Sequence, residues 1–134
     1  MREIKFRGQT YDTPPHWVFG DLYHYTTGEP AINYPHPHKK WLESEPVRPA
    51  TVGQFTGLYD CDGHEIYEGD VLGNKYPSHY KFANAVVEWG VDGWITDCFS
   101  LREFLKLHTC IVVGNIYDNS ELLPELPEVK DARD

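Results

Sequence analysis

The sequence has few cysteines, a single methionine, few basic residues and no long apolar run. Its three cysteines are odd in number and widely spaced, so they predict neither a disulfide framework nor a zinc site, and they favour a reducing compartment. No apolar segment approaches the length of a secretory core or a membrane span. We therefore expect a soluble protein of the cytoplasm that has no membrane partner.

Basic residues are too few to form an extended surface for a polyanion. Twelve Lys and Arg stand against 21 Asp and Glu, which gives a formal net charge of −9. A surface of this sign repels phosphate backbones except at a confined patch, and it favours a basic partner. The composition therefore disfavours nucleic-acid binding, although a local patch could still provide it.

Aromatic residues, in contrast, are abundant and favour β-structure. Nine Tyr, six Phe and four Trp occur among 134 residues, and such side chains pack well on half-buried pleated surfaces. A core of this size needs neither disulfides nor a metal. The sequence predicts a single, mostly-β domain over residues 1–123.

The N-terminal part, residues 1–32, is predicted to form strands. Phe6 alternates with Lys5 and Arg7, which places these two basic side chains together on a solvent-facing side. Gly20 interrupts a second aromatic-rich strand and indicates a bulge or a close backbone approach.

Two segments are predicted to lack regular structure. Residues 33–49 contain four prolines, which are incompatible with a helix or a central strand, so we expect a long surface loop. Residues 124–134 consist mainly of proline and charged residues and are predicted to be a disordered acidic tail.

Residues 50–123 carry the turn signals of a small, strongly bent barrel. In the loop over residues 60–64, Gly63 can take a positive φ angle and Asp62 can cap backbone amides. Further on, Trp89 and Trp94 flank a four-residue hairpin loop and should lie opposite each other.

One short helix and one buried strand are predicted near the C-terminus. Ser100 and Glu103 have the spacing of a capping box, so a helix should follow over residues 101–107. Residues 109–113 form a short, continuously apolar run that is rich in β-branched residues, which predicts a buried strand.

Four stretches of the sequence resemble the YopX-like proteins of bacteriophages and prophages. Thr51–Val71 is long and idiosyncratic, and the other stretches are Arg2–Gly8, Val87–Trp89, and Val113–Asn119 with Glu121–Leu123. The resemblance implies an SH3-like barrel with an N-terminal β extension, a bacterial host cell, and no catalytic residue or cofactor. We expect backbone-shaping roles at seven of the matching positions: Gly57, Asp62, Gly63, Gly69, Asp70, Gly114 and Asn115.

Metal and catalytic sites have weak support in the sequence. His36 and His38 with Cys61 and His64 are proper zinc-ligand types, but their spacing fits no ligand frame, so we expect no metal. Nucleophilic cysteines or paired acids near residue 60 would be needed for catalysis, and turn formation already accounts for these acids. We therefore expect a protein that is not an enzyme.

The remaining functions are two kinds of binding. The first is a non-enzymatic accessory module that recognises an unidentified host or phage protein, or another copy of itself. The alternative is a small barrel that binds nucleic acid through one loop, in which basic and stacking side chains interleave: Lys75, Tyr76, Tyr80 and Lys81.

Overall fold

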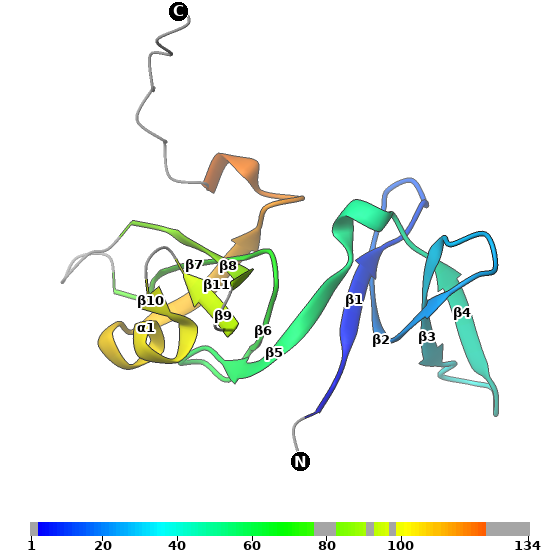
Figure 1. Cartoon of the computed structure of the whole chain (residues 1–134), viewed down its shortest axis with the longest axis horizontal. Coiled ribbons are helices and arrows are strands. Elements are labelled where there is room, and N and C mark those ends of the chain that lie inside the picture. Colours follow the sequence, from blue (N-terminus) through cyan, green and yellow to red (C-terminus); the bar gives the residue numbers. More distant parts are fainter. Residues whose placement is uncertain (1–2, 77–82, 91–92, 97–98, 123–134) are drawn as a thin grey trace, which may run out of the picture. The chain divides into compact units, whose positions relative to one another are not determined.

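The computed structural model describes residues 3–76, 83–90, 93–96 and 99–122 (Figure 1). Its backbone contacts divide the chain into two compact units. Unit 1 comprises residues 1–59 and 65–68, and unit 2 comprises residues 60–64 and 69–134. That residues 1–123 act as one domain stays a prediction, because this division describes contacts and not folding. The predicted tail, residues 124–134, lies outside the described residues.

Unit 1 contains a six-stranded antiparallel sheet in the order β4-β3-β2-β1-β5-β6. Its elements are β1 (Phe6–Gln9), β2 (Trp17–His24), β3 (Pro30–Pro35), β4 (Leu42–Pro46), the 3-10 turn η1 (Pro49–Thr51), β5 (Gly53–Tyr59) and β6 (Glu65–Tyr67). Figure 1 shows β1 to β4 following one another across this sheet. Consecutive strands are therefore neighbours, as in a meander.

The core of unit 1 lies on one face of this sheet. Val18, Ile32 and Val47 are buried together there. Partly buried side chains complete the cluster: Phe6, Leu22, Tyr34 and Val52. Gly20 makes the predicted close backbone approach, because a Cβ at this position would lie 2.1 Å from the carbonyl oxygen of Asn33 on β3.

The opposite face of the sheet holds Arg7, which the sequence placed wrongly on the solvent side. Only 6% of Arg7 is exposed. Its guanidinium lies 4.6 Å from the ring centroid of Trp17 and 4.9 Å from that of Tyr67, and Nη2 donates to the carbonyl of Glu68 at 3.3 Å. Aromatic rings from β2 and β6 thus cover the arginine, which alternation along β1 alone cannot reveal.

The prediction of a long loop over residues 33–49 is also wrong, because β3 and β4 form an antiparallel hairpin there. Proline removes a ladder hydrogen bond and is tolerated at strand ends and sheet edges. Here Pro30 and Pro35 bound β3, and Pro46 ends β4, the edge strand. The prolines therefore mark the limits of strands and not the absence of strands.

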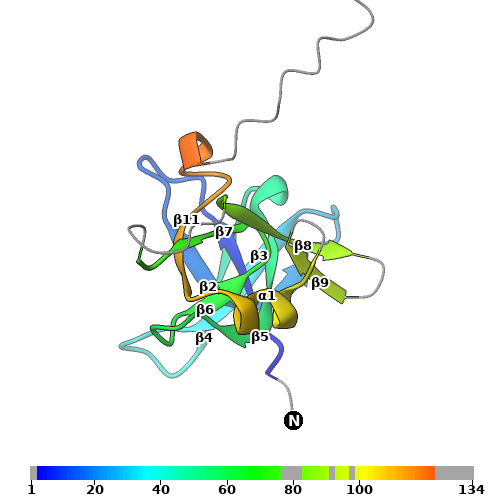
Figure 2. The ribbon, with the colours of Figure 1, turned by 90° about the vertical axis from the view of Figure 1, so that its left-hand side faces the viewer.

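Unit 2 contains a five-stranded antiparallel sheet in the order β10-β9-β8-β7-β11. Its elements are β7 (Asp70–Asn74), β8 (Ala85–Gly90), β9 (Gly93–Thr96), β10 (Phe99–Ser100), the helix α1 (Leu101–Leu107), β11 (Cys110–Asn115) and the 3-10 turn η2 (Ser120–Leu122). Figure 2 shows β8 and β9 running side by side. β11 returns to pair with β7 after the helix.

Local signals located two elements of unit 2 correctly. The helix α1 spans Leu101–Leu107, and the Ser100 hydroxyl accepts a hydrogen bond from the backbone N–H of Glu103 at 3.2 Å. In the β8–β9 hairpin, Trp89 lies directly opposite Trp94. Both predictions rested on residues close together in the sequence.

The mostly-β architecture with one short helix is confirmed, whereas no closed barrel forms among the described residues. Both sheets have open edges: β4 and β6 in unit 1, and β10 and β11 in unit 2. The predicted buried strand at residues 109–113 is this edge strand β11, of which only Cys110 is fully buried. Within the described ranges, no helix has the length and apolar character needed to cross a membrane.

Candidate functional site

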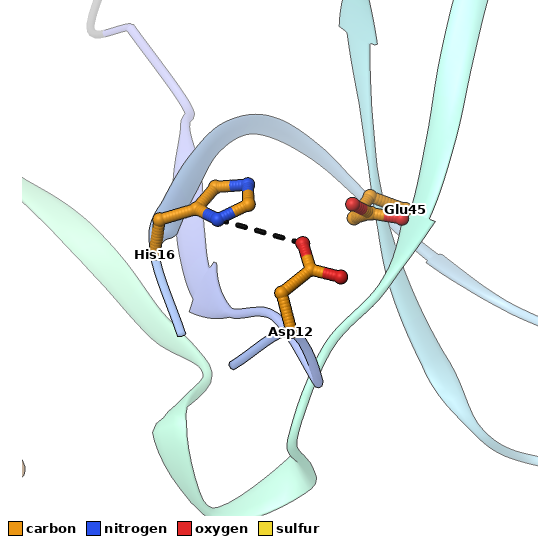
Figure 3. Close-up of side chains that lie close together, drawn as sticks. All are labelled: Asp12, His16 and Glu45. Carbon is orange, nitrogen blue, oxygen red and sulfur yellow. Dashed lines mark ion pairs between the residues drawn. The ribbon is translucent and has the colours of Figure 1, made fainter. Parts of the chain in front are cut away.

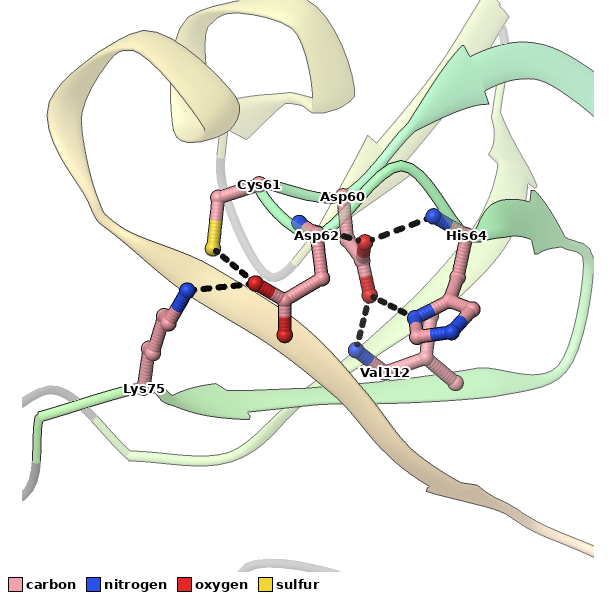
Figure 4. Close-up of polar contacts among 6 residues, drawn as sticks. All are labelled: Asp60, Cys61, Asp62, His64, Lys75 and Val112. Carbon is pink, nitrogen blue, oxygen red and sulfur yellow. Dashed lines mark hydrogen bonds and ion pairs between the residues drawn. The ribbon is translucent and has the colours of Figure 1, made fainter.

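The loop that joins β5 to β6 is organised around the buried carboxylate of Asp60 (Figure 4). Oδ1 accepts hydrogen bonds from the backbone N–H groups of Asp62 and His64, each at 2.9 Å. Oδ2 accepts one from the N–H of Val112 in β11, also at 2.9 Å, and the His64 Nδ1 lies 3.5 Å away. One side chain therefore fixes the loop and fastens it to the edge strand.

The sequence assigned this capping role to Asp62, and the assignment is wrong. Figure 4 shows the Asp62 carboxylate turned toward Lys75, with which it forms an ion pair. The thiol of Cys61 lies 3.9 Å from the same carboxylate. Gly63 takes the predicted positive φ angle, at 84°. Turn chemistry thus located the loop but not the residue that anchors it, because the anchor depends on the distant Val112.

The ionisation of these groups follows from their surroundings. Burial raises the pKa of Asp60, but the hydrogen bonds from Val112, His64 and Asp62 lower it more, so the pKa lies below its usual value. Burial raises the pKa of the Cys61 thiol and raises that of Cys110 to about 11. A general acid needs a raised carboxyl pKa and a thiolate nucleophile a lowered thiol pKa. The cluster is therefore suited to holding backbone in place.

Most of the turn residues singled out in the sequence fall at or beside strand ends, whereas Gly57 lies inside β5, where the pairing with β6 is irregular. Three of them have positive φ angles, of 82°, 84° and 90°: Gly57, Gly63 and Gly69. Asp70 begins β7 and is buried, and Gly114 lies in β11 beside its final residue, Asn115. The Asn115 side-chain oxygen accepts hydrogen bonds at 2.9 Å from the backbone N–H groups two and three residues later.

The structure describes half of the residues predicted to contact nucleic acid. Lys75 and Tyr76 are described, and the lysine Nζ lies 5.7 Å from the tyrosine ring centroid. Tyr80 and Lys81 lie outside the described residues. Because Lys75 is paired with Asp62, its charge is already partly neutralised.

The β8–β9 hairpin presents an aromatic pair to solvent. The rings of Trp89 and Trp94 meet edge to face, with centroids 4.8 Å apart, and Trp89 is 60% exposed. Phe99 and Leu107 are further exposed apolar side chains of unit 2. A Trp of equal exposure, Trp41, lies in unit 1, where only Lys39 is stacked over its ring among the described residues.

Three potential metal ligands, which the sequence did not indicate, converge in unit 1 (Figure 3). Asp12 and His16 lie between β1 and β2, and Glu45 lies on β4. One ligand atom from each lies within 4.8 Å of the others. Their spacing in the sequence matches no ligand motif, and Glu45 falls in a segment predicted as a loop.

Of the histidines and cysteine considered from the sequence, His36 and His38 lie in unit 1, and Cys61 and His64 lie in unit 2. Within the described residues, Asp12, His16 and Glu45 are the one set of three or more potential ligands that come together. The ring centroids of His36 and His38 are 6.1 Å apart, and His36 Nε2 lies 4.0 Å from a Glu43 oxygen.

The fold and these sites define a small antiparallel β protein with two sheets, one short helix and loops that are held by side-chain hydrogen bonds to the backbone. The chain belongs to the YopX protein family, whose model matches residues 5–124. This match covers all elements of both sheets and confirms the resemblance seen in the sequence.

A solved structure has the same fold. It is the crystal structure of protein EF1440 from Enterococcus faecalis, with 20% sequence identity and a TM-score of 0.58. The similarity covers 92% of this chain and 100% of that one. No curated protein matches the sequence.

Proposed function

We propose that this YopX protein is a non-enzymatic accessory protein of a phage or prophage that acts in the cytoplasm of the bacterial host and binds a basic surface of a host or phage protein. The observation that carries the proposal is the exposed Trp89 of the β8–β9 hairpin. The formal net charge of −9 supports a partner of opposite charge. The sequence resemblance to phage and prophage proteins supports the biological setting.

The geometry of the Trp89–Trp94 pair suits Trp89 to be a central residue of a protein–protein interface. Tryptophan buries a large area and is enriched among residues that dominate interface energies. Trp94 contacts the Trp89 ring edge to face and restricts its orientation before binding. An ordered ring loses less conformational entropy when a partner covers it. We therefore assign Trp89 as the central contact.

The test is capture of the partner from the host with the tagged protein, followed by affinity measurements on the purified pair. We expect Trp89→Ala to weaken binding by at least about tenfold, because truncating a central interface Trp removes most of its buried area. Trp41→Ala is the matched control, since Trp41 is equally exposed but lies in unit 1. Its affinity should equal that of the unaltered protein.

Two results would overturn the proposal. The first is loss of the captured partner after nuclease treatment, which would show that nucleic acid bridges the two proteins. The second is an equal loss of affinity in the Trp41 and Trp89 variants, which would remove the special role of the hairpin.

We also propose that unit 2 is an open form of the SH3-like barrel. Three features support this assignment: the meander from β7 to β10, the short helix α1, and the return of β11 beside β7. The open edges of the sheet distinguish it from a closed barrel.

The second candidate function, nucleic-acid binding, makes a separate prediction. We expect no submicromolar binding of single-stranded or duplex DNA at about 150 mM salt, because the net charge of −9 is unfavourable and Lys75 is paired with Asp62. Fluorescence anisotropy across a salt series measures this. Tight binding that weakens with salt and with the double change Lys75→Ala and Lys81→Ala would make nucleic acid the leading candidate.

A further inference from the structure

We propose that Asp12, His16 and Glu45 form a binding site for a divalent transition-metal ion, with Zn²⁺ as the best match. The site is independent of the Trp hairpin and of the proposed partner. One imidazole and two carboxylates converge there from two segments of unit 1, with ligand atoms within 4.8 Å of one another. Figure 3 shows the three side chains pointing toward a common point.

The spacing of the first two potential ligands is compatible with a shared metal ion, and His16 Nδ1 also lies 3.4 Å from the Thr10 hydroxyl. His16 Nδ1 lies 3.5 Å from Asp12 Oδ2. A strong hydrogen bond between these groups would be about 2.8 Å long. Two ligands at about 2.1 Å from one tetrahedral ion are about 3.4 Å apart. The observed separation is therefore close to that of two ligands of one Zn²⁺ ion.

The surroundings of Glu45 are an independent indication that a cation binds at this cluster. Its residue is only partly exposed, and its carboxylate has no hydrogen bond or ion pair with any residue that the structure describes. Other acids of this region do have cationic partners: Glu43 of the same strand lies 3.9 Å from Lys39 Nζ. A half-buried carboxylate without a partner is costly, and a cation between Glu45 and Asp12 would relieve this cost.

The backbone holds both ligand-bearing segments in place. Thr10, which is buried, donates its N–H to the carbonyl of His16 at 2.9 Å, and its hydroxyl accepts from the His16 N–H at 3.2 Å. Thr10 also forms a β-bridge with Val47, two residues after Glu45. The loop with Asp12 and His16 is thus tied beside the end of β4.

The donor set selects the class of ion. Calcium and magnesium prefer sites made of oxygen ligands, whereas an imidazole nitrogen favours Zn²⁺ and its first-row neighbours. The two carboxylates of Asp12 and Glu45 balance the charge of a divalent ion. Three protein ligands at a solvent-exposed position leave a fourth coordination position for water.

The experiment is a calorimetric titration of the full chain with Zn²⁺ at pH 7, in a Cys61→Ser background that removes the exposed thiol. We expect His16→Gln and Glu45→Gln each to weaken Zn²⁺ binding by at least about tenfold. Glu43→Gln is the matched control, because Glu43 lies on the same strand and near His36 but outside the cluster. It should change the affinity by less than about twofold.

A second measurement does not depend on the folding of any variant. Zn²⁺ added to the Cys61→Ser protein should shift the imidazole nitrogen resonances of His16 in NMR spectra more than those of His36 and His38. Absence of a His16 shift under excess Zn²⁺, or unchanged affinity in both ligand variants, would overturn the proposal.

Discussion

Replacing Asp60 with alanine is expected to lower the free energy of unfolding of the protein by about 3 kcal/mol. The side chain of Asp60 is fully buried and accepts backbone hydrogen bonds from Asp62, His64 and Val112. Its removal leaves three donors without this acceptor and removes one of the loop's ties to the edge strand β11, where the Cys61 N–H also donates to the Cys110 carbonyl at 3.2 Å. Urea denaturation followed by circular dichroism measures the loss, and hydrogen exchange of the Val112 amide locates it.

The matched control is Asp62→Ala, which removes a carboxylate from the same loop. Asp62 is partly exposed, and its ion pair with Lys75 is open to solvent, so its loss should have a much smaller effect on the denaturation midpoint. Equal destabilisation by the two substitutions would contradict the assignment of Asp60 as the anchor. Unchanged protection of the Val112 amide in Asp60→Ala would contradict it as well.

The same contacts make the stabilisation depend on pH. Because the pKa of Asp60 is lower in the folded protein than its ordinary value of 3.8, the unfolded chain binds a proton at this carboxyl at a higher pH than the folded chain does. The contribution is therefore complete above a pH of about 4 and is lost as the pH falls through the lower folded pKa. Denaturation at pH 3 and pH 7 should therefore show a larger loss of stability at pH 3 in the unaltered protein than in Asp60→Ala, in which the other carboxylates still titrate.

Elements that are determined by contacts between residues close together in the sequence could be predicted. The capping box of Ser100 and Glu103 located α1, since both partners of the contact belong to the helix start. The Trp89–Trp94 pair followed from the length of one hairpin loop. The family resemblance also came from ordered local motifs, and the family match confirms it.

Features that depend on distant residues could not be predicted in this way. Arg7 is buried because Trp17 and Tyr67 cover it from other strands. Asp60 anchors its loop through Val112, which is 52 residues away in the chain. The β3–β4 hairpin forms despite its prolines because β4 is an edge strand, and position in a sheet is not visible in local sequence.

The cluster of Asp12, His16 and Glu45 illustrates the same limit at a candidate site. Metal motifs are recognised by short spacings on one element, whereas Glu45 is 33 residues beyond Asp12. It reaches the other two ligands only because of the pairing between β3 and β4 and the bridge between Thr10 and Val47. Because residues 33–49 were expected to form a loop, the sequence did not indicate that Glu45 lies beside Asp12 and His16.

Gly20→Ala is expected to lower the free energy of unfolding of the protein by about 3 kcal/mol. A Cβ at this position would lie 2.1 Å from the backbone oxygen of Asn33 and 3.3 Å from the Ile32 side chain. The obstacle is backbone of the adjacent strand, so it cannot be relieved by rotating a side chain. β2 and β3 would have to separate within the six-stranded sheet, which weakens their ladder and the core cluster around Ile32. Urea denaturation and amide exchange along β2 and β3 measure this effect.

Gly28→Ala provides the comparison within the same unit. Gly28 has a positive φ angle of 92°, but a Cβ there would meet no atom within 4 Å. Its replacement should cost only the backbone strain, about 1 kcal/mol. If Gly20→Ala proves no more destabilising than Gly28→Ala, the close approach between β2 and β3 at Gly20 is not a feature of the folded protein.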